Sequence, residues 1–581
     1  MSMEFDLIIR GGEVIDGSGA EAKRADVGVT GGRIAAIGEL DGAAAGKTLD
    51  ASGSVVAPGF IDTHSHADCT ILLFPGAESL LRQGFTTFVG GNCGNSPAPL
   101  AEQYLMQCWE LDFWDELEPY CFYERSPLPA ERVRAYMREK LGYDMDWRSF
   151  GDFLERVERA GIAANYVPLA GHGQIRAQVM GEDHLRAATR AEAEAVAAGV
   201  REAMEAGAWG VSTGLDYAPG AYADRRELVL AAAESAAFGG IYATHWRRTG
   251  IRRGNSRPSA KLDGILEAIA IAEESGASCE ISHILSGYDI TPEGGPGMDE
   301  AAVRATLAPI DEALGRGLDI SFDVIPNTSG GIDILPWLVQ YFRPWVKQAG
   351  GTGQFLRNLR AADFREYVKR SVDRGDWYLL GSEGQRGWPE RLRVLRSSVP
   401  GRAGRSAAEL GEELGLGPVD TLFALLEEDP ATLVWQEQFS AASVREFLRH
   451  PRALVGSDSF ALDAVGIYGL QEPPYIMPHP NTYCAAVSFL TGYAPGGLAG
   501  AVHQLTGRPA RRLGLERRGL IAEGYQADIT VFTPGALRTN ESFSEPRSFP
   551  SGIRHVLVNG GCAVEEGEST SARTGRVLRR R

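Results

Sequence analysis

Two histidines two residues apart, His64 and His66, follow an apolar stretch of the chain. The stretch covers residues 55–61, and its composition predicts a buried strand entered through the Pro58-Gly59 turn. Residues two apart on a strand point to the same side, so both imidazoles can face one metal ion. Neutral imidazole is a common ligand of zinc and related metals. Two histidines satisfied within a core are the alternative interpretation.

Further residues of the kinds that bind metals stand where other apolar runs end. Five of the ten histidines fall at such positions, which a random scatter would seldom produce. The residues at these ends are His64, His66, Cys93, His172, His245, His283, Asp323 and Asp458. Nitrogen, thiolate and carboxylate donors together suit Zn²⁺, so the set predicts a zinc site. Cys93 can instead be a small buried apolar residue, although its glycine-rich surroundings favour a ligand.

A catalytic zinc site keeps one position open for water and lowers the pKa of that water towards about 7. Asp458 then has a natural role as general base and acid. It would orient the water, take its proton and deliver the proton to the leaving nitrogen. A plain metal ligand or a cap at the end of a strand are the alternatives for Asp458, and these roles can coexist with catalysis.

The residues that carry this chemistry need a scaffold that brings distant strand ends together. Apolar runs alternate with helical patterns rich in Ala, Glu and Arg, which is typical of a parallel α/β sheet. Eight barrel strands are predicted, at 56–64, 85–92, 165–171, 208–214, 240–245, 278–284, 318–325 and 453–458. The fold class is therefore α/β, a (β/α)8 TIM-like barrel with its site at the C-terminal ends of the strands.

The two ends of the chain predict a second, smaller domain. Short strands separated by glycine turns occupy residues 5–56, and matching strands occur at 527–532 and 556–560. We expect a small β-sandwich built from residues 1–57 and 506–581, with the barrel at 58–505. Two insertions interrupt the barrel, one rich in aromatics at 97–150 and a mostly helical one at 326–450. The aromatic insertion is either a cap over the site or a surface or oligomer contact.

Composition indicates which partners the protein is not expected to bind and which cellular compartment it is expected to occupy. The net charge of −18 argues against nucleic acid and anionic membranes as partners, and no apolar run is long enough to span a bilayer. Seven scattered cysteines and an acidic N-terminus without a signal peptide predict a reducing cytoplasm. A homo-oligomer is possible. The short basic tail at 573–581 is expected to be disordered.

The segment Pro58-Gly59-Phe60-Ile61-Asp62-Thr63-His64-Ser65-His66 resembles the first-strand motif of the amidohydrolase superfamily. Four further segments narrow the resemblance to the D-aminoacylase (N-acyl-D-amino-acid deacylase) branch: Gly91-Asn92-Cys93-Gly94, Gly171-His172-Gly173, Ser212-Thr213-Gly214-Leu215 and Ser457-Asp458. Residues 518–528 also resemble this branch. The resemblance covers nearly the whole chain.

The resemblance implies a (β/α)8 barrel with a β-sandwich and a zinc-dependent amide hydrolysis with one or two Zn²⁺ ions. By motif match, His64, His66 and Asp458 take the first metal position. The second position falls to Cys93, which can bridge, together with His245 and His283. Many members of the superfamily use a carboxylated lysine on strand four as the bridge, but no lysine lies near residues 208–214.

Four positions depart from the groups with which the family binds a substrate carboxylate. Leu285 stands in place of a lysine, Ile325 and Asn327 in place of two tyrosines, and Asn481 in place of an arginine. A buried carboxylate without a cation would be costly. The substrate is therefore predicted to lack that carboxylate or to place it differently, and the aromatic insertion favours a bulky or aromatic amide.

Further residues are assigned to the substrate from the sequence. Arg247, Arg248, Arg252 and Arg253 can form an alternative anion site, although such a loop is often merely solvated. The predicted substrate-binding residues are Trp246, Arg247, Asp323 and Asn481. His172 can polarise the scissile carbonyl, with simple packing as the equal alternative.

The sequence thus predicts a zinc-dependent hydrolase of a linear amide bond, an N-acyl amino acid or related N-acyl amide deacylase acting on a small molecule. A cyclic amide, carbamate or urea hydrolase with the same site is the rival within enzymes. A barrel that has lost catalysis and serves as a scaffold is the rival outside them.

Overall fold

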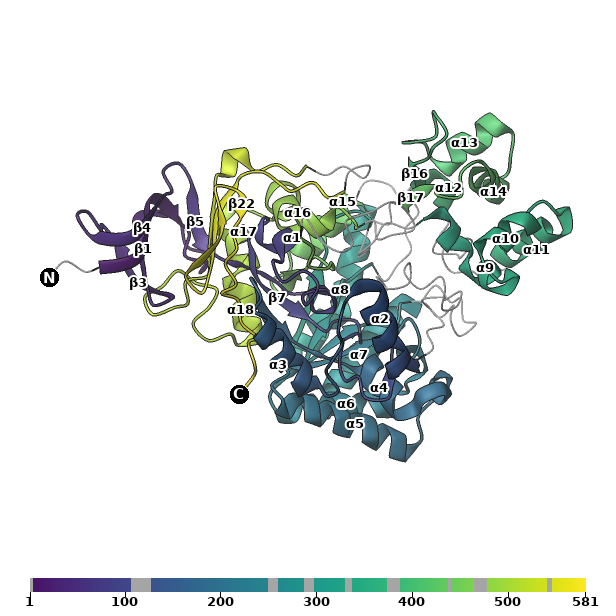
Figure 1. Cartoon of the computed structure of the whole chain (residues 1–581), viewed down its shortest axis with the longest axis horizontal. Coiled ribbons are helices and arrows are strands. Elements are labelled where there is room, and N and C mark those ends of the chain that lie inside the picture. Colours follow the sequence, from purple (N-terminus) through teal and green to yellow (C-terminus); the bar gives the residue numbers. More distant parts are fainter. Residues whose placement is uncertain are drawn as a thin grey trace.

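The computed structural model describes residues 4–105, 127–248, 260–286, 297–329, 337–373, 387–436, 440–463, 478–540 and 546–581. A strand is present in each of the eight predicted barrel segments (Figure 1). These strands are β6 (Phe60–Asp62), β7 (Phe85–Gly90), β10 (Asn165–Pro168) with β11 (Ala170–Gly171), β12 (Gly210–Gly214), β13 (Ile241–His245), β14 (Ser278–Ile281), β15 (Ile320–Val324) and β18 (Ala453–Val455). Each strand pairs in parallel with the next in chain order.

The hydrogen bonding returns from the last of these strands to the first. The Thr63 amide donates to the Val455 carbonyl at 3.3 Å, and the Asp458 amide donates to the His64 carbonyl at 2.8 Å. Gly456 allows this approach, since a Cβ there would lie 2.5 Å from the His64 Cβ. The order is that expected of a (β/α)8 barrel, and it brings the ends of β6 and β18 side by side.

Helices cover the outside of these strands and follow them in alternation. They are α1 (Glu78–Leu81), α2 (Ala130–Leu141), α3 (Phe150–Ala160), α4 (His172–Met180), α5 (Arg190–Glu205), α6 (Arg225–Ala237), α7 (Ala260–Ser275), α8 (Met298–Gly315), α15 (Ala441–Leu448), α16 (Asn481–Ser488), α17 (Leu498–Leu505) and α18 (Gly507–Leu513). Local sequence sets their starts: Thr189 caps α5 and forms a capping box with Glu192. Apolar side chains between strands and helices form the largest core of the protein.

A nine-stranded sheet combines strands from the two ends of the chain (Figure 1). Its strands are β1 (Glu4–Val14), β2 (Lys23–Thr30), β3 (Arg33–Gly38), β4 (Ala44–Asp50), β5 (Val55–Pro58), β19 (Ile529–Phe532), β20 (Ile553–Val558), β21 (Gly561–Glu565) and β22 (Glu568–Ser569). The ends meet where β5 pairs antiparallel with β19, Val56 opposite Val531. The strand predicted at 56–64 is therefore two strands, because the chain passes from this sheet to the barrel at Gly59.

A separate group of elements lies within the second insertion, apart from the rest of the chain in Figure 1. It contains α9 (Arg343–Ala349), α10 (Thr352–Asn358), α11 (Ala362–Asp373), α12 (Trp388–Arg391), β16 (Leu392–Arg396), α13 (Ala407–Leu414), α14 (Pro418–Glu428) and β17 (Leu433–Gln436). We call residues 337–436 the lobe. Its apolar side chains form a core of their own. Helix α15 follows the lobe but packs on the barrel, where Phe447 contacts Phe322 of β15.

The prediction of a disordered basic tail is wrong. The Leu578 amide donates to the Tyr166 carbonyl at 2.7 Å, and Arg579 pairs with Glu158 at 2.9 Å. Apolar residues within the tail explain this order, since Val577 is buried and Leu578 packs against the cluster at the base of the barrel strands. Among the described residues, no helix combines the length and the apolar character needed to cross a membrane.

Candidate metal centre

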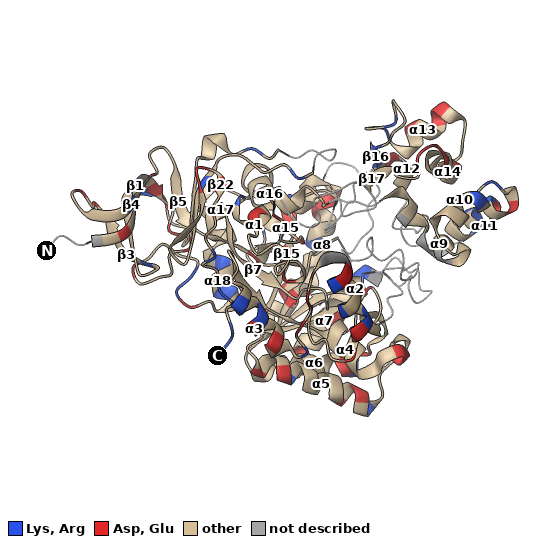
Figure 2. Ribbon diagram, in the orientation of Figure 1, with Lys and Arg blue, Asp and Glu red and all other residues tan. Residues whose placement is uncertain are grey.

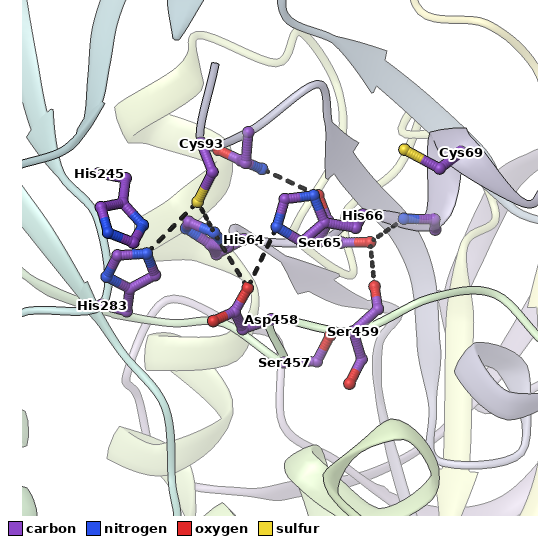
Figure 3. A network of polar contacts seen from close by, with 12 residues as sticks. His64, Ser65, His66, Cys69, Cys93, His245, His283, Ser457, Asp458 and Ser459 are labelled. Atoms are coloured by element: carbon purple, nitrogen blue, oxygen red, sulfur yellow. Dashed lines mark hydrogen bonds and ion pairs between the residues drawn. The ribbon is translucent and has the colours of Figure 1, made fainter. Parts of the chain in front are cut away.

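The six predicted metal ligands converge at the C-terminal ends of the barrel strands (Figure 3). His64, His66, Cys93 and Asp458 offer donor atoms that lie within 4.8 Å of one another. A second group, formed by Cys93 with His245 and His283, meets the same limit, so Cys93 belongs to both. All six side chains are buried.

The distances between these donor atoms suit a bound metal ion. Cys93 Sγ lies 3.3 Å from His64 Nε2 and 3.3 Å from His283 Nε2. Asp458 Oδ1 lies 3.4 Å from His64 Nε2 and 3.3 Å from His66 Nε2. Donors bound to one zinc ion at tetrahedral angles are roughly 3.4 Å apart. The residues present therefore fit a metal site in both chemistry and spacing.

Three of the candidate ligands have an unusual backbone conformation. Only seven non-glycine residues in the described part of the chain have positive φ, and Cys93 (56°), His283 (36°) and Asp458 (49°) are among them. Such conformations cost free energy and persist where the surrounding structure enforces them, often at functional sites. Gly91 precedes Cys93 with φ +83°, and a Cβ there would lie 2.0 Å from the Leu169 carbonyl oxygen. The backbone is thus shaped to present these side chains.

Two of the histidines have a carboxylate on the ring nitrogen that does not face the cluster. Asp323 Oδ2 lies 3.1 Å from His64 Nδ1, and Asp216 Oδ2 lies 3.5 Å from His245 Nε2. A carboxylate in this position fixes the tautomer and the orientation of a metal-binding imidazole and raises its basicity. The arrangement at His64 is that of a histidine prepared to bind a metal through its other nitrogen, whereas Nε2 of His245 has both Asp216 and the Arg248 guanidinium close by.

The charges of the cluster favour anionic donors. Burial alone would raise the pKa of the Cys93 thiol, but the imidazoles of His64 and His283 hold that pKa well below its ordinary value. Burial would also raise the pKa of Asp458, and His64 and His66 hold it well below its usual range. Thiolate and carboxylate are the forms in which these groups bind a metal.

Asp62 is a site residue to which the sequence analysis gave no role. It lies two residues before His64 and is fully buried. Its Oδ1 accepts hydrogen bonds from the amides of His64, at 3.2 Å, and of Ser457, at 2.9 Å, while its Oδ2 accepts from the Ser457 hydroxyl. Asp62 therefore ties β6 to the segment that carries Asp458. Its i−2 spacing from His64 was the available signal.

Trp246 and Arg247, which the sequence assigns to the substrate, both make contacts within the chain. Trp246 is fully buried, and its indole N–H donates to the Ser282 carbonyl at 3.2 Å. Arg247 pairs with Glu267 at 3.0 Å and donates to three backbone carbonyls, among them that of Ala221 at 2.8 Å. Both side chains are engaged in the packing around the ends of the strands, and their contact with a substrate stays a prediction.

Asp323 and Asn481, also predicted to bind the substrate, make contacts within the chain that position other residues. Both oxygens of Asp323 are engaged, one with His64 and the other with the His283 amide at 2.6 Å. Asn481 is buried and donates from its side chain to the Ser457 carbonyl. Their role is to position the candidate ligands and the strand end beside Asp458.

His172 does not join the cluster of candidate ligands. It begins α4, where its Nε2 lies 2.9 Å from Glu227 Oε1, and both side chains are fully buried. Arg176 contacts the same carboxylate oxygen at 2.9 Å. The structure thus places His172 in a buried ion-pair network between α4 and α6, which agrees with the packing alternative.

Of the remaining arginines of the predicted anion site, only Arg248 lies within the described residues. Arg248 lies beside the cluster, where its Nη2 is 2.6 Å from His245 Nε2. Its Nε and backbone amide both contact Asp216, at 3.3 and 2.9 Å. Arg252 and Arg253 lie outside the described residues, as does the aromatic part of the first insertion at 106–126.

Comparison with known proteins gives relatives along the whole chain. The family model described as "Amidohydrolase family" matches residues 47–305. N-acyl-D-glutamate deacylase and D-aminoacylase of Alcaligenes xylosoxydans xylosoxydans are 30% and 31% identical, each over 100% of this chain and 98% of the relative. The crystal structure of N-acyl-D-glutamate deacylase from Bordetella bronchiseptica, complexed with zinc and a phosphonate inhibitor, aligns with a TM-score of 0.69 at 28% identity. That alignment covers 99% of this chain and 100% of that one.

Proposed function

Because the chain belongs to the D-aminoacylase branch of the amidohydrolase superfamily, we propose that it hydrolyses a linear N-acyl amide, with N-acyl amino acids as the principal substrate class. It is an amidohydrolase that acts on carbon–nitrogen bonds other than peptide bonds. The convergence of four imidazoles, one thiol and one carboxylate beside Asp62 and Asp323 is the observation that supports this proposal.

Zn²⁺ is the ion we propose for this site, because it accepts this mixture of nitrogen, sulfur and oxygen donors. His64, His66 and Asp458 would form one position, and Cys93, His245 and His283 the other, with Cys93 shared. When bound, the metal supplies a Lewis acid that makes water more acidic and polarises the amide carbonyl. One ion or two ions can be accommodated by the two groups.

The chain's own contribution to the reaction centres on Asp458. Its carboxylate lies beside His64 and His66, where it would accept the proton of the attacking water. As the oxygen–carbon bond forms and the carbon–nitrogen bond breaks, the same proton passes to the leaving amine. Asp62 and Asn481 hold the backbone at Ser457, next to Asp458, and so keep this carboxylate in place.

A neutral or bulky amide is the second candidate for the substrate. The positions at which the family carries its carboxylate-binding groups offer no cation here. Leu285 is partly buried and packs against the main core, and Asn481 is committed to the Ser457 carbonyl. This candidate and the first share the reaction and differ in the charge of the substrate.

We further propose the finer features that the sequence predicted: a (β/α)8 barrel, a β-sandwich formed by the terminal sheet, and residence in the reducing cytoplasm. The five cysteines in the described part of the chain are unpaired, which is in keeping with such a compartment. A homo-oligomer stays a prediction.

The experiment that tests this function combines metal analysis with a panel of amides. The purified protein is expected to contain transition metal, to lose activity on dialysis against a chelator, and to regain it on addition of Zn²⁺. Release of free amine from N-acetyl amino acids, their carboxamide analogues, hydantoins and ureas identifies the bond cleaved. Cleavage of only the cyclic substrates or ureas would contradict the proposal. Substoichiometric metal with no activity after Zn²⁺ addition would favour a scaffold.

A further inference from the structure

We propose that Arg248 binds the carboxylate of the substrate at the edge of the candidate metal centre. This inference rests on the proposed function and names the residue that would hold the carboxylate of its principal substrate class. It also explains how the chain can lack the usual cations at positions 285 and 481 and still accept an acid.

The position of Arg248 is the first argument. Its Nη2 lies 2.6 Å from Nε2 of His245, one of the candidate ligands. Asp216 Oδ2 lies 3.5 Å from the same Nε2, and Nδ1 of His245 can bind a metal where Nε2 carries the proton and donates it to that carboxylate. The guanidinium is therefore one imidazole ring away from the metal position. In an N-acyl amino acid the carboxylate is two bonds from the scissile nitrogen, so a cation at this distance is within its reach.

The free edge of the Arg248 guanidinium is the second argument. Asp216 contacts its Nε at 3.3 Å and its backbone amide at 2.9 Å, which fixes the side chain. Within the described part of the chain, its Nη1 has no hydrogen-bond partner, and 20% of the side chain is exposed, against 3% for Asp216. An arginine held in this way can donate from Nη1 to a carboxylate. Arg247, by contrast, has its donors committed to Glu267 and to backbone carbonyls.

The lack of other cations is the third argument. The positions at which the family binds a substrate carboxylate carry Leu285 and Asn481 here, and a carboxylate buried without a cation would be costly. Arg248 is an arginine that directly contacts a candidate ligand, so it is the group placed to offset this cost.

The test compares wild type with Arg248→Gln on matched pairs of substrates, N-acetyl amino acids and their carboxamide analogues. The variant is expected to lower kcat/KM for the acids by on the order of 100-fold, mainly through KM, because a charged hydrogen-bonding pair is lost. For the carboxamides the change should be less than about threefold. Arg248→Lys should recover part of the activity on acids. Metal content, measured by mass spectrometry, should be unchanged in both variants.

Arg225→Gln is the matched control, since Arg225 pairs with Glu274 at 2.5 Å on the surface of the barrel and is 51% exposed. Equal losses on acids and carboxamides, or loss of metal, would overturn the inference and assign Arg248 to positioning His245. No loss on either series would overturn it as well. If metal-loaded wild type cleaves neither series, the proposed function fails instead, and the two outcomes are thus distinguishable.

Discussion

The carboxylates behind the candidate ligands are as important to this site as the ligands themselves. Asp323 and Asp216 contact the outer nitrogens of His64 and His245, and Asp62 holds the backbone amides that orient His64 and Ser457. An imidazole that is free to rotate or to change tautomer binds a metal weakly. Asp323 and Asp216 thus lie on ring nitrogens of His64 and His245, two of the four candidate imidazoles, and none of the three acids is itself one of the six predicted ligands.

At the scale of single residues, Asp458→Asn separates proton transfer from metal binding. The amide has the same size as the carboxylate but cannot accept a proton, so kcat should fall by about 10³-fold or more. Metal should stay bound at Cys93, His245 and His283, as measured by mass spectrometry of the dialysed protein. Asp311→Asn, which changes a surface pair with His450, is the control. Near-normal turnover of Asp458→Asn would refute the role of this carboxylate as base.

At the scale of elements, helix α18 closes the base of the barrel strands and brings arginines to it, seen as a blue segment in Figure 2. Arg512 of α18 contacts Glu280 of β14 at 3.4 Å, and the Ser321 hydroxyl of β15 donates to the same carboxylate. Glu280 Oε1 has no hydrogen-bond partner among the described residues. Burial raises the pKa of Glu280 to about 7 despite Arg512. The packing of α18 thus leaves an acid under the site that is costly to ionise.

Stability should therefore depend on pH through Glu280. Between its ordinary pKa of 4.5 and about 7, the folded protein holds a proton that the unfolded chain has lost. The free energy of unfolding of wild type should then fall as pH rises, relative to Glu280→Gln, by at most about 1.4 kcal/mol per pH unit. Thermal unfolding of both proteins from pH 5 to 8 measures this difference, with the more exposed Glu158→Gln as control. A difference that is flat or of opposite sign would show that Glu280 does not titrate in this range.

At the scale of the whole molecule, the lobe has its own core and its own ion pairs. Lys369 of α11 pairs with Asp420 of α14 at 2.8 Å, and Arg365 pairs with Glu427 at 2.6 Å. Trp337 and Leu433 form a bridge, so the two ends of the lobe leave it side by side. An insertion with these properties can fold as a unit of its own.

Replacement of residues 337–436 by a short glycine–serine linker should therefore leave the barrel folded. The shortened protein is expected to keep its metal stoichiometry. Its unfolding temperature should be close to that of the barrel in wild type, because the lobe core is separate from the barrel core. The isolated lobe should show cooperative thermal unfolding. Insolubility of the shortened chain together with loss of metal would show that barrel and lobe are one cooperative unit.

The sequence by itself determined the barrel strands and their chemistry. Apolar runs, glycine turns and strand-end polar residues are local patterns, and parallel strands bring their carboxyl ends to one face whatever the details of packing. For that reason His64, Cys93, His283 and Asp458 could be expected together, and the structure does place them within a few ångströms.

Only the tertiary structure decided where neighbouring side chains point and which segments far apart in the chain meet. Arg247 turns into the packing while Arg248 reaches His245, although the two are adjacent in the sequence. The basic tail is ordered because its apolar residues find a surface beside Tyr166, and Asp216 becomes a site residue because β12 and β13 are neighbours. Such contacts depend on the summed packing of distant segments, which no local pattern contains.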